Sequence, residues 1–398
     1  MDDRDPWFVH LSLYGAEPVD RSRFLAAAKK NRRILEAAAR AGMRLVVVDT
    51  SCVPQPPGLA PELAPLAARG RLRLIRFPGF GRPALARLLI LLWLPITMLK
   101  LHAWLPRHRD GQGRAPVLFS FYNPMASETI PMIMARLLRP GAARILFYDD
   151  ALFARHKVDL RLRSVVDQIP WLIARHLPTD VFAVNQRLLG DLKARHSRTS
   201  LLPCLVESQP ATVPRRPCTS PLRLLYAGGL KQEKGIPLLL QLAGRLPPGV
   251  ELAISGKGPM QETCAKVATV EPALTFHGCL SEEAFQHLQN SCSTLISLHA
   301  VMEGVFPFKL IDAIHSGMAV ISGPVQSPDW LGEPDGLFIL GTDAFANDPV
   351  GATIRMLPRV QAFLEQRSAA SLAATRRRME SHCSVSVLSE RLRAINHR

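Results

Sequence analysis

The sequence predicts an α/β protein with two doubly wound parallel sheets. Between Leu222 and Ser322, short apolar runs that suit buried strands alternate with segments whose apolar residues recur at helical spacing. Glycines stand at most of the turns from strand to helix in this stretch, as they do where parallel strands end beside a ligand. A proline-rich segment, residues 209–221, is the predicted linker to an N-terminal half with the same alternation. This order predicts two Rossmann-like domains that face a central cleft.

The N-terminal domain, residues 1–208, begins with a β-α-β unit. A strand is predicted at 6–15, a helix that ends at glycine at 22–42, and a second strand at 43–51. The proline-rich run at 53–65 is predicted to be a loop. Further strands are predicted at 71–78, 116–124, 143–150 and 179–185, and further helices at 84–105, 166–178 and 186–196.

The C-terminal domain, residues 222–380, continues the alternation and then becomes helical. Residues 349–379 are predicted to form a continuous, arginine-rich helical region. Segment 381–398 contains a last amphipathic helix, and packing of this helix back on the N-terminal domain is one option. The apolar runs of this half predict strands at 222–228, 250–256, 273–278, 293–299, 318–322 and 336–340.

The chain is strongly basic, with 49 lysines and arginines against 33 acidic residues and a formal net charge of +16. Nucleic acid, an anionic membrane surface and phosphate-bearing substrates would each suit this charge, and so would arginines that are merely solvated on helix faces. The arginines are spread along the chain, and aromatic residues make up only 6%. We therefore expect no nucleic acid among the partners.

The cysteines and the apolar segments indicate a cytoplasmic protein. Seven cysteines are scattered without a C-x-x-C pair, which argues against a zinc site and a disulfide framework and fits a reducing cytosol. The acidic first residues are unlike a signal peptide. The most apolar run, Leu88–Met98, is 11 residues long, whereas a bilayer span needs about 20.

The helix predicted at 84–105 leaves two interpretations open. It could pack on the sheet as a core helix. Alternatively, its apolar body, its tryptophans Trp93 and Trp104 and the basic segment 106–114 behind it are typical of a helix that lies on a membrane surface. The second interpretation would make the protein peripheral to the inner face of the membrane.

Three segments of the C-terminal half combine a strand end with residues that suit a nucleotide. They are GGLKQEKG at 228–235, SGKGP at 255–259 and PFKLID at 307–312. Glycine at a strand end lets a phosphate approach the backbone, and the helix that follows offers free N–H groups and the positive end of its dipole. Lysines add positive charge, and a carboxylate can accept two hydrogen bonds from the ribose hydroxyls.

These motifs resemble those of the retaining glycosyltransferases of glycosyltransferase family 4, which have the GT-B fold. The similarity is firm from about Leu222 to Ser322 and topological over the first 205 residues. It implies that the C-terminal domain binds a nucleotide-sugar and that the N-terminal domain binds the acceptor. It implies neither a metal nor a cofactor, because the nucleotide-sugar is a substrate.

The resemblance implies donor-binding roles for particular residues. Lys234 stands at the position of the family's phosphate-binding lysine, but Gly229 stands where the family has an arginine, for which Lys231 could substitute. Asp312 stands, as a shorter acid, at the position of the ribose-binding glutamate. The donor-binding residues implied in this way are Gly228, Gly229, Lys231, Lys234, Gly256, Gly258, Phe306, Pro307 and Asp312.

The catalytic candidates are Glu303, Asp150 and Lys309. In the family a first acid stands eight residues before the ribose-binding acid, and that position is Gly304 here. Either the loop has one extra residue and Glu303 serves, or the acid has been lost. Lys309 would face phosphate from the first turn of the following helix, whereas Asp150 ends a predicted strand of the N-terminal half.

The acceptor-binding candidates lie at strand ends of the N-terminal half. Asp149 and Asp150 are adjacent, so at most one of them is expected to point into the cleft; both could instead be helix caps. The acceptor-binding residues implied are Gly15, Asn123, Glu128 and Asp149.

The leading hypothesis is a glycosyltransferase that acts with retention on a glycan or lipid-linked acceptor, in the synthesis of cell-surface polysaccharide or glycoconjugates. The alternative is a catalytically weakened homologue that binds a nucleotide-sugar or a partner protein. It is motivated by the missing arginine, by the displaced Glu303 and by the absence of the family's histidine at 121–123. Among the histidines present, His299 is the best placed, whereas His10 is expected to be a hydrogen-bonded core residue.

Overall fold

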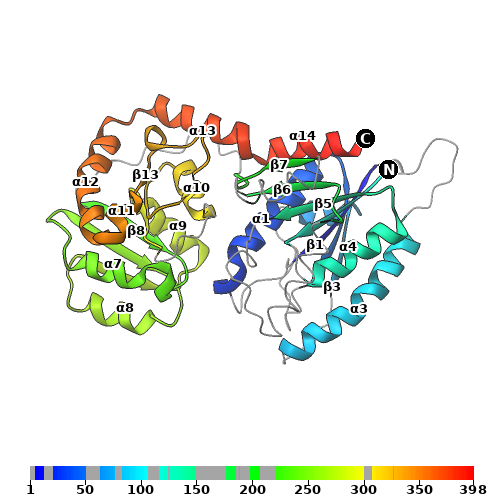
Figure 1. Cartoon of the computed structure of the whole chain (residues 1–398), viewed down its shortest axis with the longest axis horizontal. Coiled ribbons are helices and arrows are strands. Elements are labelled where there is room, and N and C mark those ends of the chain that lie inside the picture. The colour runs from blue at the N-terminus through cyan, green and yellow to red at the C-terminus, as the bar shows by residue number, and fades with distance from the viewer. Residues whose placement is uncertain are drawn as a thin grey trace. The chain divides into compact units, whose positions relative to one another are not determined.

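The computed structural model describes residues 5–12, 21–50, 63–76, 83–105, 116–123, 126–148, 176–184, 188, 198–206, 221–299, 307–325 and 327–398. The chain divides into two compact units. Unit 1 comprises Met1–Glu207 and Cys383–Arg398, and unit 2 comprises Ser208–His382 (Figure 1). Unit 1 is therefore formed from both ends of the chain.

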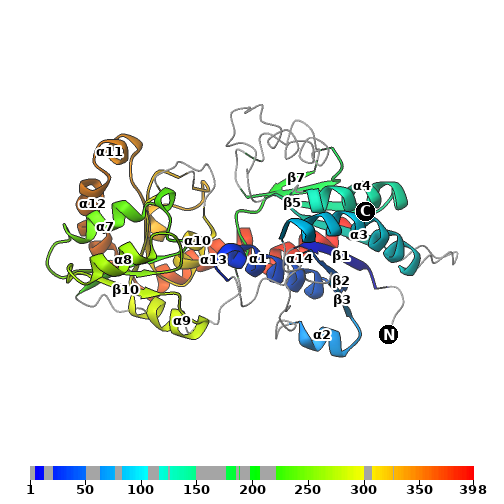
Figure 2. The same ribbon diagram turned by 90° about the horizontal axis from the view of Figure 1, so that it is seen from below.

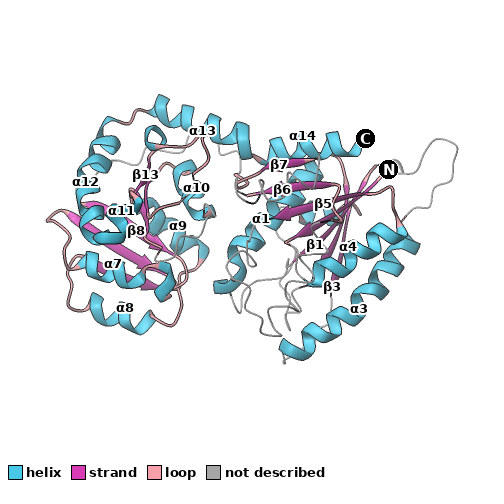
Figure 3. Cartoon of the chain, in the orientation of Figure 1, coloured by secondary structure: helices cyan, strands magenta, loops and turns pink. Residues whose placement is uncertain are grey.

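Unit 1 contains a parallel sheet. In its described residues, seven strands are hydrogen-bonded in the order β3-β2-β1-β4-β5-β6-β7. Figure 3 shows the strands in magenta and the helices in cyan. Strand β2, which lies between β1 and β3, is buried at every position, as expected of a parallel strand that is covered on both faces. The strands are β1 (Trp7–Ser12), β2 (Arg44–Asp49), β3 (Leu72–Arg76), β4 (Val117–Tyr122), β5 (Ala143–Tyr148), β6 (Asp180–Ala183) and β7 (Thr199–Leu201).

Helices from both ends of the chain pack on this sheet. Helix α1 contacts β1 and β2, and α4 contacts β4 and β5. The last helix, α14, packs along α1, where the Arg393 guanidinium donates to the Arg40 carbonyl oxygen at 2.6 Å. The described helices of unit 1 are α1 (Arg21–Arg40), α2 (Ala64–Ala68), α3 (Pro83–Trp104), α4 (Ala126–Leu138) and α14 (Val385–Asn396).

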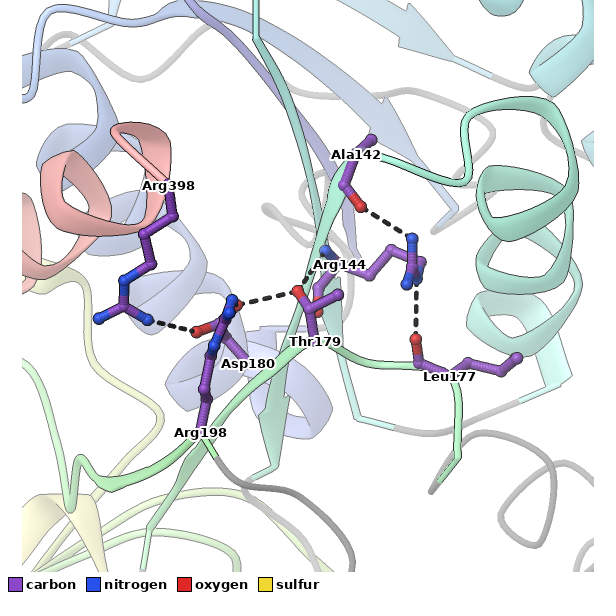
Figure 4. A network of polar contacts seen from close by, with 7 residues as sticks. All are labelled: Ala142, Arg144, Leu177, Thr179, Asp180, Arg198 and Arg398. Atoms are coloured by element: carbon purple, nitrogen blue, oxygen red, sulfur yellow. Dashed lines mark hydrogen bonds and ion pairs between the residues drawn. The ribbon is translucent and has the colours of Figure 1, made fainter.

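A polar network at the amino ends of β5 and β6 also joins the end of α14 to the sheet (Figure 4). The buried Arg144 guanidinium donates to the carbonyl oxygens of Leu177 and Ala142, each at 2.8 Å, and burial lowers its pKa. Asp180 forms ion pairs with Arg198 at 4.0 Å and Arg398 at 3.7 Å. These contacts lie at the end of the sheet opposite to the one where ligands bind in parallel α/β folds, so we assign them a structural role.

Unit 2 contains a second parallel sheet. In its described residues, six strands are ordered β10-β9-β8-β11-β12-β13. The strands are β8 (Leu222–Ala227), β9 (Val250–Ser255), β10 (Leu274–Gly278), β11 (Thr294–Ser297), β12 (Ala319–Ser322) and β13 (Leu337–Ile339). The described helices are α7 (Ile236–Ala243), α8 (Gln261–Ala268), α9 (Glu282–Ser291), α10 (Phe308–His315), α11 (Thr342–Asn347), α12 (Pro349–Gln366) and α13 (Ala369–Cys383), with short 3-10 turns at Gln232–Lys234 and Glu333–Asp335.

The prediction of one continuous helical region at 349–379 was wrong. Helix α12 ends at Gln366, because Arg367 is extended (ψ 118°) and its guanidinium bonds to the Gly317 carbonyl oxygen. Ser368 then caps α13, since its hydroxyl accepts a hydrogen bond from the backbone N–H of Ser371 at 3.0 Å.

Other predicted elements agree in kind and order with the observed ones and differ by a few residues at their ends. The first strand is described from Trp7 to Ser12, and the predicted residues 13–15 lie outside the described residues. The predicted loop at 53–65 overlaps the start of α2, and α11 was not predicted. The helices predicted at 166–178 and 186–196 fall almost wholly outside the described residues, as does the predicted linker. None of the described helices is long and apolar enough to cross a membrane.

Candidate functional site

The candidate donor site lies where the strand order of unit 2 reverses. Strand β8 has β9 on one side and β11 on the other, so the connections from β8 and β11 leave the sheet in opposite directions. In open parallel sheets, ligands bind beyond the carboxyl ends of the strands at this switch point. Gly228 follows β8 directly, and Lys309 lies at the start of α10, the helix after β11.

Two glycine turns pack against each other at this edge. The backbone N–H of Gly228 donates to the Ser255 carbonyl oxygen at 3.1 Å, and both Gly228 (φ 150°) and Gly256 (φ 153°) have conformations that favour glycine. A Cβ at Gly256 would collide with the Gly228 carbonyl oxygen, and one at Gly258 would press on Leu230. Chain packing therefore requires Gly256 and Gly258 whether or not a ligand binds, and it holds the two turns close together.

Gly229 differs from its neighbours. A Cβ at this position would meet no heavy atom within 4 Å, and its φ lies outside the left-handed range. The position at which the resemblance places an arginine is therefore sterically open. Lys231, the proposed substitute, is exposed and forms an ion pair with Glu233 at 3.7 Å. Lys234 is partly buried in the short turn that precedes Gly235 and α7.

Lys309 lies above the Gly228 turn. Its ammonium nitrogen is 4.5 Å from the centre of the Tyr226 ring, a cation–π distance. It would also be 3.9 Å from a Cβ placed on Gly228. The Tyr226 hydroxyl donates to the Gly229 carbonyl oxygen at 2.9 Å, and burial raises its pKa, so the phenol stays protonated. Tyr226 thus joins the glycine turn to Lys309.

Sequence reasoning missed Tyr226, because an aromatic residue in a buried strand looks like any other core residue.

Asp312 stands one helical turn after Lys309, on the same side of α10, which begins after Pro307. It is partly buried. The end of this helix is fixed from α13: the Arg376 guanidinium donates to the His315 carbonyl oxygen at 2.9 Å, and His315 Nε2 lies 3.2 Å from Glu380. Burial lowers the pKa of His315.

The structure brings Gly228, Gly229, Gly256, Gly258 and Lys309 to one edge of the sheet. Lys231 and Lys234 follow in the β8 turn, and Pro307 and Asp312 lie on α10. Glu303 and Phe306 fall outside the described residues. His299, at the boundary of that segment, has its Nδ1 at 3.2 Å from the Ser297 hydroxyl.

Asn123 is the described acceptor candidate of unit 1. It follows β4, is buried and has a φ of 62°, and its backbone N–H donates to the Phe147 carbonyl oxygen at 2.9 Å. A positive φ is uncommon for a residue other than glycine, and such strain often occurs at functional sites. Glu128 lies within α4, and its side chain is outside the described atoms. Gly15, Asp149 and Asp150 are outside the described residues.

His10 is a buried polar core residue, as expected. Its Nδ1 lies 2.9 Å from the Ser120 hydroxyl and its Nε2 lies 3.2 Å from the Asn31 amide oxygen. Burial lowers the pKa of His10 to about 4, so the imidazole is neutral at physiological pH. Within the described residues, no group of three His, Cys, Asp or Glu side chains is arranged to hold a metal ion.

Part of the chain is similar to a known protein family. Residues 221–355, which include every described donor-site candidate, match the family model of Glycosyl transferases group 1. No curated protein sequence matches the chain.

Solved structures match over nearly the whole chain. Sucrose-phosphate synthase from Thermosynechococcus elongatus is 15% identical with a TM-score of 0.68, and the match covers 98% of both chains. HepE from Anabaena, solved with UDP, is 13% identical with a TM-score of 0.62, again over 98% of both chains. WaaG, a glycosyltransferase involved in lipopolysaccharide biosynthesis, is 14% identical with a TM-score of 0.63, over 97% of this chain and 99% of WaaG. Residues 221–355 are therefore similar to the group 1 glycosyltransferases, and the chain as a whole has the GT-B fold of these solved structures.

Proposed function

We propose that this glycosyltransferase moves a sugar, with retention of configuration, from a nucleotide-sugar held by unit 2 to a glycan or lipid-linked acceptor held by unit 1. Cell-surface polysaccharide or glycoconjugate synthesis is the process that such an acceptor implies. The observation that carries the proposal is the position of Lys309, whose ammonium lies above the Gly228 turn at the switch point of the sheet.

The donor site would work mainly by electrostatics. When the bond between sugar and diphosphate breaks, negative charge grows on the leaving diphosphate. The ammonium of Lys309, the ammonium of Lys234 and the free N–H groups at the start of α10 would stabilise this charge. Asp312 would accept hydrogen bonds from the ribose hydroxyls. Lys309 and Asp312 are three residues apart on α10, about 4.5 Å along the axis, which suits the neighbouring phosphate and ribose groups of one nucleotide.

The first donor to test is a uridine nucleotide. HepE was solved with UDP, with UDP and glucose, and with UDP-glucose. The diphosphate is common to all nucleotide-sugars, so the proposed lysine contacts would serve any base. We propose Glu303 and Asp150 as catalytic acids, Phe306 and Pro307 as donor contacts, and Gly15, Asn123, Glu128 and Asp149 as acceptor contacts. Neither a metal nor a cofactor is required.

Ligand-dependent thermal stability tests the donor site. UDP and UDP-glucose should raise the melting temperature, because a ligand that binds only the folded state stabilises it. Lys309→Ala should weaken UDP binding by roughly tenfold to a hundredfold, the effect of losing a hydrogen bond to a charged group. Asp312→Ala and Lys234→Ala should also weaken it. The matched control is Lys266→Ala, which removes an exposed lysine from α8.

The outcomes separate the two hypotheses. Lack of stabilisation by any nucleotide, or equal loss in the Lys266 control, would contradict the donor site. Nucleotide binding without sugar transfer or donor hydrolysis would favour the weakened homologue, for which the open position at Gly229 is the supporting observation. Once an acceptor is found, the anomeric proton coupling of the product measures retention directly.

A further inference from the structure

Helix α3 is apolar on both of its faces. Its 22 residues include only two Lys or Arg side chains, Arg87 and Lys100, and no acid. One face is buried in unit 1 through Leu94, Met98 and Leu101. A helix that is apolar on all sides is normally enclosed by protein or by lipid.

The opposite face of α3 is exposed. Leu92, Ile96 and Leu99 are 61%, 44% and 50% exposed and recur at the spacing of one helical face. Trp93 and Trp104 flank them at 46% and 43%. We call these five residues the outer face of α3. Among the described residues, they make up five of the seven exposed large apolar side chains, so the exposure is concentrated on this helix. Clustered apolar exposure of this kind marks an interaction surface.

The cations around the outer face indicate what covers it. Lys100 is exposed on the same side of α3, and the Arg73 guanidinium of β3 lies 4.5 Å from the centre of the Trp104 ring. Helix α4 runs beside α3 (Figures 1 and 2), and the Arg139 guanidinium after it donates to the Leu105 carbonyl oxygen at 3.0 Å.

The sequence around these helices is also poor in acid. Over residues 83–139, the only acidic residues are Asp110 and Glu128. The basic residues of the same segment are Arg87, Lys100, Arg107, Arg109, Arg114, Arg136 and Arg139.

We propose that the outer face of α3 docks on the surface of an anionic lipid bilayer. Leu92, Ile96 and Leu99 would enter the boundary between headgroups and acyl chains, where tryptophans such as Trp93 are favoured. Lys100 and Arg73 would reach anionic headgroups. Each would make the free energy of membrane binding more favourable, because the membrane surface has a negative potential. The helix lies on the membrane and does not cross it, in agreement with its length and hydropathy.

This surface belongs to unit 1 and is independent of the donor site in unit 2. Two other occupants, a second copy of the chain and a partner protein, would cover the apolar side chains without requiring the cations. An anionic bilayer would contact both the apolar side chains and the cations, and this distinguishes it from a second copy or a partner protein.

Vesicle co-sedimentation of the full chain tests the proposal. The protein should bind vesicles of phosphatidylcholine with phosphatidylglycerol, bind pure phosphatidylcholine vesicles much more weakly, and dissociate as salt is added. Combined Leu92→Ser, Ile96→Ser and Leu99→Ser substitutions should raise the apparent dissociation constant about a hundredfold, and Leu99→Ser alone several-fold. The matched single control is Val270→Ser, which changes an exposed apolar residue of unit 2.

Three results would overturn the proposal. The first is that the parent protein binds neither kind of vesicle. The second is that the triple variant binds vesicles as tightly as the parent protein. The third is that the parent protein is a dimer in solution and the triple variant is a monomer. The last result would assign the face to a second copy. Unaltered UDP stabilisation of the triple variant shows that its fold and its donor site are intact, so failure of this proposal is distinct from failure of the donor site.

Discussion

The contacts that hold the strands together differ between the two sheets. In unit 2 the carboxyl edge of the sheet is made of backbone, because the turns after β8 and β9 pack so closely that Gly256 and Gly258 leave no room for a Cβ. Among the described residues of unit 1, β1 is instead tied to β4 and α1 by side chains, because His10 bonds to Ser120 and Asn31. A backbone-built edge requires glycine at fixed positions and so leaves a motif in the sequence, whereas a side-chain-built edge can use many residue combinations.

The largest effect is expected at Gly235. It has a φ of 79°, and a Cβ there would collide with the Leu298 carbonyl oxygen at the end of β11. Gly235→Ala should destabilise unit 2 by about 3 kcal/mol or more, because backbone must shift to relieve the collision. Urea unfolding followed by circular dichroism measures this change. Gly229→Ala is the control and should stay within about 0.5 kcal/mol. Equal costs at the two positions would show that the edge of unit 2 is not set by backbone packing.

An intermediate effect is expected at His10 and depends on pH. Burial lowers the pKa of His10 from an ordinary 6.5 to about 4 in the folded state. On acidification, His10 therefore becomes protonated in the unfolded chain at a pH where it is still neutral in the folded chain. The stability associated with neutral His10 is present above its unfolded pKa and is lost as the pH falls toward 4. Between about pH 7 and about pH 5 this loss should be about 2 kcal/mol.

His10→Gln removes this titration while keeping polar atoms near Ser120 and Asn31. The pH dependence of the unfolding free energy should flatten by about the same 2 kcal/mol in the variant. If the variant and the parent lose stability in parallel over this range, the imidazole of His10 is not the titrating group.

The smallest effect is a gain in UDP affinity when Gly229 is replaced by arginine. Because no heavy atom lies within 4 Å of a Cβ there, Gly229→Arg should fold normally and place a guanidinium next to the proposed diphosphate site. UDP affinity should increase about tenfold, since a guanidinium can form two parallel hydrogen bonds to phosphate oxygens. Isothermal titration calorimetry measures the gain, and Gly229→Gln controls for side-chain size without charge. An equal affinity in the two variants would place the diphosphate elsewhere.

The order of strands and helices was predictable because the spacing of apolar residues along the chain differs between strands and helices. Both parallel sheets follow from this order. The break between α12 and α13 was not predicted, since it depends on Arg367 reaching the distant Gly317 carbonyl oxygen. The serine that restarts the helix at 368 was a local signal that could have revealed it.

The part of the candidate donor site that consists of glycine turns was predictable from the sequence. The glycines of the β8 and β9 turns could be located from the sequence, whereas the placement of Lys309 over Tyr226 joins residues far apart in the chain and leaves no spacing to detect. Of the two sequence-based interpretations of α3, the core helix agrees with its buried face, and membrane docking stays a proposal for its exposed face. Periodicity could not choose between them because both faces are apolar.

The composition of unit 1 from both ends of the chain has a consequence for how the protein is made. Val206 and Ser384 form a β-bridge where the chain leaves unit 1 and where it returns, and α14 then completes the packing against α1. On the ribosome, all of unit 2 is synthesised before α14 emerges. Domains usually fold as units in the order of their synthesis, yet here the unit that begins the chain is the last to be finished. Nascent unit 1 must therefore wait, with the α1 surface uncovered, until α14 has been translated.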